Sequence, residues 1–109
     1  MVTRASWWTR GWWPWAVYQG DRWDDRDADG VELAPSVRLI TTPGHSHEDI
    51  TTIVGTRDGV VACTHAWWAD GGPRDDPRAV DPVALDRSRR RVLAVADIIV
   101  PGHGPAYRA

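Results

Sequence analysis

The chain has 109 residues, a length that fits one small domain. Its formal net charge of -2 gives no general attraction to nucleic acid or to an anionic membrane. No stretch approaches the ~18 consecutive apolar residues that a membrane-spanning helix needs, so we expect no membrane partner. The single cysteine, Cys63, excludes an internal disulfide. The first residues lack the apolar region of a signal peptide, and we therefore expect a cytoplasmic protein.

Residues 1–23 contain six of the eight tryptophans, at positions that fit neither helix nor strand periodicity. Such a segment is either an aromatic platform for sugars, bases or a membrane interface, or a poorly structured leader from a displaced start or a truncated gene. We favour the leader. The acidic stretch 21–30 is expected to be a solvated linker. The predicted organisation is therefore a leader with an acidic loop, 1–29, followed by one partial domain, 30–109.

Short runs of apolar and β-branched residues predict a series of strands in that domain. These strands cover residues 31–33, 37–41, 50–54, 60–64 and, as the final strand, 97–100. The strand 50–54 is expected to end at Gly55. The Asp58-Gly59 pair after it favours a tight hairpin turn into the strand 60–64.

One main helix is predicted near residues 82–95, after a Gly-, Pro- and Asp-rich loop. Asp81 is the expected N-cap and Pro82 the first helical residue. The expected apolar face consists of Leu85, Ser88, Val92, Leu93 and Ala96. The basic patch Arg87, Arg89, Arg90 and Arg91 is either a nucleic-acid contact or a solvated helix face, and we expect the latter. A helix followed directly by a buried strand indicates an α/β fold.

The same Pro-Gly-His turn follows two of the apolar strands and ends in His45 and His103. An imidazole on a glycine turn at the end of a strand is a common way to present a metal ligand or a proton carrier. An exposed turn histidine without function is the alternative. Because the turn occurs twice, we expect both rings at one rim of the sheet. His65 also follows a predicted strand and is the third candidate ligand.

These turns, together with the helix-to-strand run 81–97, resemble the C-terminal half of metallo-β-lactamase-fold hydrolases over roughly residues 30–108. The resemblance implies half of an αβ/βα sandwich with one or two zinc ions at the sheet edge. It implies that His45 and His103 are metal ligands. Where the family has a bridging aspartate, this chain has His65, which is expected to serve as a terminal imidazole ligand because imidazole does not bridge two metals as a carboxylate does.

The family's His-x-His-x-Asp-His motif has no match here, and residues 1–29 contain no histidine. The resemblance implies a metal-dependent hydrolase that cleaves an ester, thioester or phosphodiester by metal-bound hydroxide, with a small molecule or RNA as substrate. No catalytic residue is assigned; Glu48 and Asp49 are the nearest candidates for a general base. One alternative is a truncated, inactive remnant, or a half-domain that needs a partner chain, as a homo-oligomer or with a complementing chain. A Trp-rich binding module is a third reading.

Overall fold

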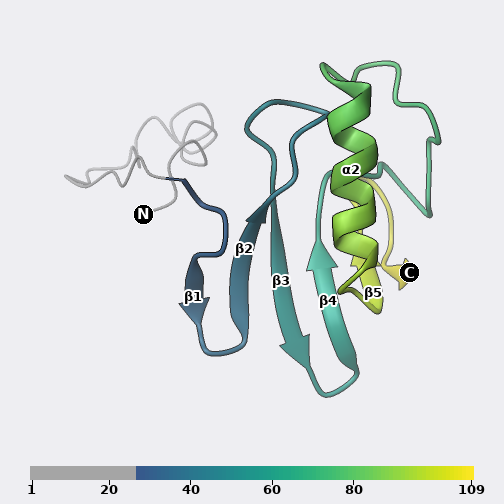
Figure 1. Ribbon diagram of the computed structural model, residues 1–109. Coiled ribbons are helices and arrows are strands. Elements are labelled where there is room, and N and C mark those ends of the chain that lie inside the picture. The colour runs from purple at the N-terminus through teal and green to yellow at the C-terminus, as the bar shows by residue number, and fades with distance from the viewer. Residues whose placement is uncertain (1–26) are drawn as a thin grey trace, which may run out of the picture.

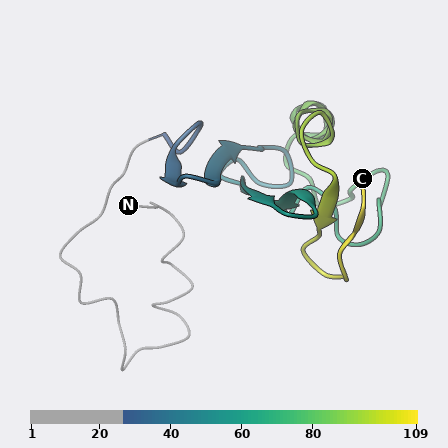
Figure 2. The same cartoon turned by 90° about the horizontal axis from the view of Figure 1, so that it is seen from below.

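The computed structural model describes residues 27–109, and the Trp-rich segment 1–23 lies outside this range. In the described range six strands form one sheet, in the order β1-β2-β3-β4-β5-β6. The strands are β1 Glu32–Ala34, β2 Val37–Thr41, β3 Ile50–Thr56, β4 Gly59–Cys63, β5 Ile98–Val100 and β6 Tyr107–Arg108. The helix α2, Pro82–Leu93, lies on one side of the sheet (Figure 2). The predicted α/β fold class is confirmed.

Strand direction decides what meets at the edges of this sheet. β2 and β3 pair antiparallel, as do β3 and β4, so β2 and β4 run in the same direction (Figure 1). β5 pairs parallel with β4, with Cys63 opposite Val100. The carboxyl ends of β2, β4 and β5 therefore lie at the same edge of the sheet, and each of these strands is followed by one of the candidate histidines.

The predicted strands agree with the structure to within two residues at either end, with one error in their order. β3 is two residues longer than predicted and continues through Gly55 to Thr56, because these residues pair with Val60 and Gly59 of β4. The predicted strand 97–100 exists as β5, but the prediction that it is the final strand is wrong. β6 follows β5 and pairs with it antiparallel. A strand of two residues is too short to leave a pattern in the sequence.

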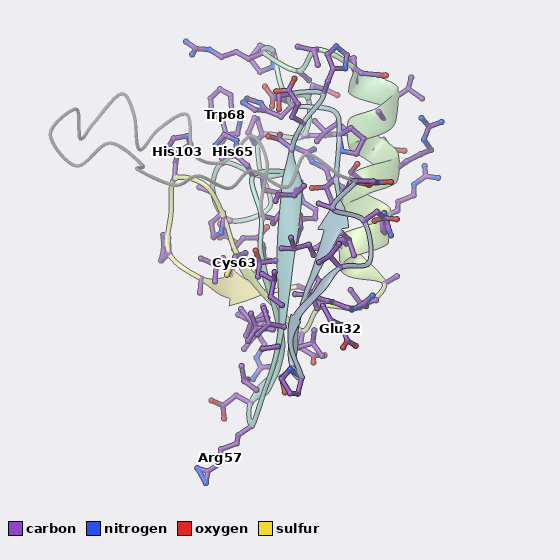
Figure 3. All side chains as sticks on the ribbon, turned by 90° about the vertical axis from the view of Figure 1, so that its left-hand side faces the viewer. Glu32, Arg57, Cys63, His65, Trp68 and His103 are labelled. Carbon is purple, nitrogen blue, oxygen red and sulfur yellow. The ribbon has the colours of Figure 1, made fainter. Side chains whose placement is uncertain are left out.

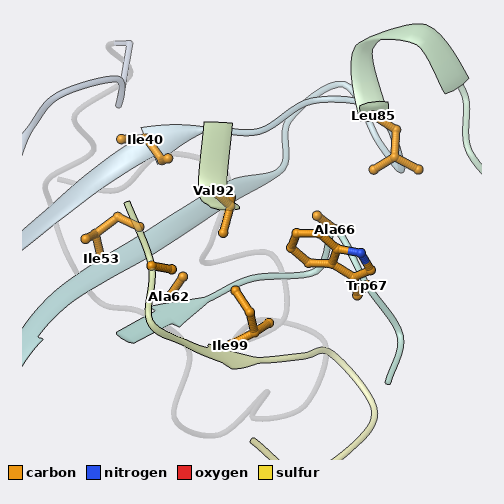
Figure 4. Packing of buried hydrophobic residues seen from close by; sticks show 9 residues of the cluster. Ile40, Ile53, Ala62, Ala66, Trp67, Leu85, Val92 and Ile99 are labelled. Atoms are coloured by element: carbon orange, nitrogen blue, oxygen red, sulfur yellow. The ribbon is translucent and has the colours of Figure 1, made fainter. Parts of the chain in front are cut away.

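The hydrophobic core lies between the sheet and α2 (Figure 4). It contains Ile40, Ile53, Ala62 and Ile99 from the strands, Leu85 and Val92 from the helix, and Ala66, Trp67 and Ala96 from the connecting segments. The predicted apolar face of the helix is correct except at Leu93, which is 50% exposed while Val92 is fully buried. Leu93 projects about 100° around the helix axis from Val92, on the side away from Ser88, and this places it at the margin of the buried face.

The start of α2 is fixed to the turn that carries His45. The Asp81 carboxylate accepts a hydrogen bond from the Ala84 N–H at 3.0 Å, which caps the helix as predicted. The Asp81 N–H donates to the Gly44 carbonyl at 2.9 Å. Gly44 has a φ of 145° and lies against the Leu85 backbone, where a side chain would collide. Glycine is therefore required for this turn to contact the helix.

Arg89 is not part of a solvated face, contrary to the sequence-based expectation. Its guanidinium donates to the Ala66 and Pro73 carbonyls, each at 2.8 Å, and to the Arg74 carbonyl at 2.7 Å. It also lies over the Trp67 ring, 5.5 Å from the ring centroid. One side chain of α2 thus holds the segment after β4 in place.

The predicted linker 21–30 is part of the fold at its C-terminal end, which corrects the expectation of a wholly solvated stretch. The Asp29 carboxylate accepts from the Thr41 N–H at 2.9 Å and pairs with Arg91 at 2.8 Å. The hydrogen bond from Thr41 and the Arg91 charge together lower the pKa of Asp29. In residues 27–109 no helix has the length and apolar character to cross a membrane.

We expect Val92→Ala to lower the free energy of unfolding by about 1–3 kcal/mol, because it leaves a cavity in the core. The matched control is Leu93→Ala, which removes a half-exposed side chain from the same helix turn and should change stability by about 0.5 kcal/mol or less. Urea unfolding followed by circular dichroism measures both. Equal losses for the two variants would contradict the described position of α2 on the sheet.

Candidate metal centre

The structure brings His45, His65 and His103 together at the sheet edge where β2, β4 and β5 end. The ring centroids of His45 and His65 are 4.7 Å apart, and those of His65 and His103 are 5.1 Å apart. The Nε2 atoms of His65 and His103 lie 3.2 Å from each other. Figure 3 shows His65 and His103 beside Trp68, at the end of the sheet opposite Arg57. The fourth histidine, His47, is exposed.

The turn that carries His103 is held against the segment after β4. Its backbone donates twice, from Gly102 to the Trp67 carbonyl at 3.1 Å and from His103 to the Trp68 carbonyl at 2.7 Å. The His65 ring lies directly against Gly102, where even a methyl group would overlap it. The absence of a side chain at this turn residue therefore allows the two imidazoles to approach each other.

Three buried threonines connect the strands beneath the histidines. Thr51 on β3 donates its hydroxyl to Thr64 Oγ1 at 2.8 Å, and its oxygen lies 2.8 Å from Thr42 Oγ1. All three side chains are almost fully buried. Thr64 also accepts from the Ala66 N–H at 3.1 Å. This hydroxyl chain satisfies the buried polar groups and joins the ends of β2, β3 and β4, so it fixes the backbone from which His65 projects.

A buried carboxylate that the sequence analysis did not select lies beside His45. Asp76 Oδ2 is 2.6 Å from His45 Nδ1 and accepts from the Trp68 indole N–H at 3.2 Å, while Oδ1 accepts from the Arg78 N–H at 2.8 Å. Burial raises the pKa of this carboxyl, but the hydrogen bonds, from His45 foremost, outweigh it and the net pKa is lowered. Both oxygens of Asp76 thus take part in hydrogen bonds.

The remaining candidates from the sequence, Asp49 and Glu48, lie in the turn after His45. Asp49 accepts from the Ser46 hydroxyl at 2.8 Å and closes the turn after His45, and Glu48 is exposed. Neither is shown to act as a general base. Burial, together with the neighbouring His45 ring, lowers the pKa of His65 and favours its neutral form, the form that binds metals.

The donor set fits a metal ion such as zinc in chemistry and in part in geometry. Two nitrogen ligands of one tetrahedral zinc ion, each about 2.0–2.1 Å from it, lie about 3.3–3.4 Å apart. The 3.2 Å between the Nε2 atoms of His65 and His103 is close to this separation. Over residues 27–109, however, no group of three or more His, Cys, Asp or Glu side chains is arranged as a ready metal site. The His65–His103 pair thus has the spacing of two zinc ligands, and the His45 ring lies next to His65.

The chain is similar in sequence to curated metallo-beta-lactamase domain-containing proteins. It is 42% identical over 82 residues to metallo-beta-lactamase domain-containing protein 1 of Homo sapiens, a match that covers 72% of this chain and 31% of that protein. It is 40% identical over 80 residues to the Mus musculus protein of the same name. The chain belongs to the metallo-β-lactamase superfamily. It spans about a third of the length of these relatives. No protein-family model matches it.

Solved structures of the superfamily contain a region with the fold of this chain. An N-acyl homoserine lactone hydrolase, solved with its product N-hexanoyl-L-homoserine at the catalytic metal centre, superposes with a TM-score of 0.54 at 27% identity, over 68% of this chain and 33% of that chain. A superfamily protein from Sulfolobus tokodaii gives a TM-score of 0.55 at 21% identity, over 87% of this chain and 41% of that one. The predicted half of a metallo-β-lactamase sandwich is confirmed.

Asp76 and Trp68 are the residues that sequence reasoning missed. Trp68 follows His65 by three positions, and Asp76 belongs to the loop predicted to have no regular structure. Loop aspartates are common in solvated turns, and Asp75 and Asp76 give no sequence signal that separates them. Only the fold brings Asp76 next to His45, 31 positions away in the chain.

We expect Gly102→Ala to displace the His65 ring from His103, because the new methyl group overlaps the imidazole. Imidazole ¹H–¹⁵N correlation spectra should show shifted His65 and His103 signals. Gly55→Ala is the control, since that position leaves room for a methyl group. Unchanged histidine signals in Gly102→Ala would contradict the described contact.

Proposed function

We propose that His45, His65 and His103 hold a metal ion in a metal-dependent hydrolase of the metallo-β-lactamase superfamily. The observation that carries the proposal is the meeting of three imidazoles from three separate strand ends, two of them with Nε2 atoms 3.2 Å apart. The curated relatives and the lactone hydrolase with product at its metal centre support the same class. We infer that this ion is zinc, because neutral imidazole nitrogen is a good zinc donor.

Each ring would offer one nitrogen to the ion. His65 and His103 would use the Nε2 atoms that already face each other, and His45 would use Nε2 because its Nδ1 is bonded to Asp76. When bound, the ion would supply Lewis-acid activation of water for hydrolysis of an ester, thioester or phosphodiester bond. His103 is exposed, which leaves this side of the cluster open to a substrate.

Trp68 adds an apolar surface to the cluster. Its ring centroid lies 6.4 Å from that of His45 and 6.4 Å from that of His103, with the rings nearly perpendicular. An indole ring in this place would contact the apolar part of a substrate held at the histidines. The substrate class stays a prediction: a small molecule or RNA. The partner chain that would complete the domain also stays a prediction.

The test is direct zinc binding by the purified chain. We expect the parent to bind zinc in competition with a chromophoric chelator, and His45→Ala, His65→Ala and His103→Ala each to weaken binding at least tenfold, because each removes one ligand. His47→Ala is the matched control: it removes an exposed histidine two residues from His45 and should leave affinity unchanged.

Loss of affinity in His47→Ala equal to that in the three cluster variants would contradict this ligand assignment. A folded parent that binds no zinc would contradict the proposed function for this chain. That result would favour the alternative, a chain without activity of its own. Circular dichroism of every variant confirms that a loss of binding is not a loss of folding.

A further inference from the structure

We infer that Asp76 is a positioning residue for His45: its carboxylate fixes the tautomer and orientation of the imidazole so that Nε2 faces the cluster. The inference rests on the proposed function, since an oriented Nε2 matters only if His45 binds a ligand there. Asp76 is not one of the three histidines: it belongs to the loop 69–80, in which no candidate ligand was predicted.

The hydrogen bond between Asp76 and His45 determines which ring nitrogen of His45 carries the proton. Both Asp76 oxygens accept from N–H groups that can only donate, so the carboxylate is the acceptor toward His45 as well, and His45 Nδ1, 2.6 Å from Oδ2, carries the proton. In the neutral ring the lone pair must then be on Nε2. His45 thus has its free nitrogen on the side away from Asp76.

Burial and further hydrogen bonds hold the Asp76 carboxylate firmly in place. The Asp76 side chain is 0% exposed, against 20% for His45. It accepts two further hydrogen bonds, from the Trp68 indole N–H and from the Arg78 N–H. With three nitrogen partners on two oxygens, the carboxylate cannot turn without breaking at least one of these hydrogen bonds. A rigid acceptor of this kind restricts the histidine that donates to it.

The loop that carries Asp76 is anchored on both sides of this residue. Arg89 on α2 donates to the carbonyls of Pro73 and Arg74, just before Asp76. The Val80 N–H donates to the His45 carbonyl at 3.3 Å, just after it. The loop is thus tied to the helix on one side of Asp76 and to the His45 turn on the other, which makes its position part of the site.

Asp76→Asn is the test, because an asparagine has the same shape but only one acceptor oxygen. If that oxygen stays with the Arg78 N–H, the amide NH₂ faces His45 and can donate to Nδ1, which moves the ring proton to Nε2. We expect ¹H–¹⁵N spectra of the metal-free parent to show His45 with its proton on Nδ1. Asp76→Asn should show a shift toward the Nε2–H form, and zinc affinity should fall about 10–100-fold.

Two controls separate positioning from folding. Asp75→Asn changes the adjacent exposed carboxylate and should alter neither the His45 signals nor zinc affinity. Trp68→Phe removes one donor to Asp76 but keeps the carboxylate, so His45 should stay in the Nδ1–H form. The inference is overturned if Asp76→Asn leaves the His45 tautomer and the zinc affinity as they are in Asp75→Asn.

The His45 tautomer and the zinc affinity test the positioning role and the proposed function separately. The tautomer is measured without metal, so it tests the link between Asp76 and His45 even if the parent binds no zinc. A parent with the Nδ1–H form and no zinc binding would overturn the proposed function while leaving this hydrogen bond intact. A parent that binds zinc but has His45 in the Nε2–H form would overturn the positioning role alone.

Discussion

The parallel pairing of β4 with β5 is the constraint on which the site depends. Because Cys63 lies opposite Val100, the residues that follow these two strands leave the sheet at the same edge, and His65 and His103 meet there. The two antiparallel steps from β2 to β4 bring the His45 turn to that edge as well. A connection that instead paired β5 antiparallel with β4 would carry His103 to the opposite edge of the sheet.

The contacts around this edge hold the segments that carry the histidines in fixed positions. Helix α2 contributes core side chains to the sheet, its first residues hold the His45 turn, and Arg89 holds the segment that leads from His65 to Asp76. The buried hydroxyl chain through Thr51 fixes the strand ends from below. The site is therefore built on regular elements with their hydrogen bonds satisfied, which is what precise placement of side chains requires.

The sequence predicted the elements well and the details of the site less well. Apolar runs, the Asp81-Pro82 helix start and the repeated Pro-Gly-His turns are local patterns, so strands, helix and two candidate ligands could be found without the fold. Arg89, Asp29 and Asp76 could not, because polar side chains in loops and on helix faces look alike until distant segments meet. Leu93 was misplaced because apolar periodicity alone does not set the edge of a buried helix face.

The central claim is that three imidazoles from three strand ends bind one common ion, and anomalous diffraction at the zinc absorption edge tests it most directly. In crystals grown with zinc, the account predicts an anomalous peak about 2.0–2.1 Å from the Nε2 atoms of His45, His65 and His103 together. A zinc ion found only on His47 or on surface carboxylates, with the His65 and His103 rings still in direct contact, would contradict it.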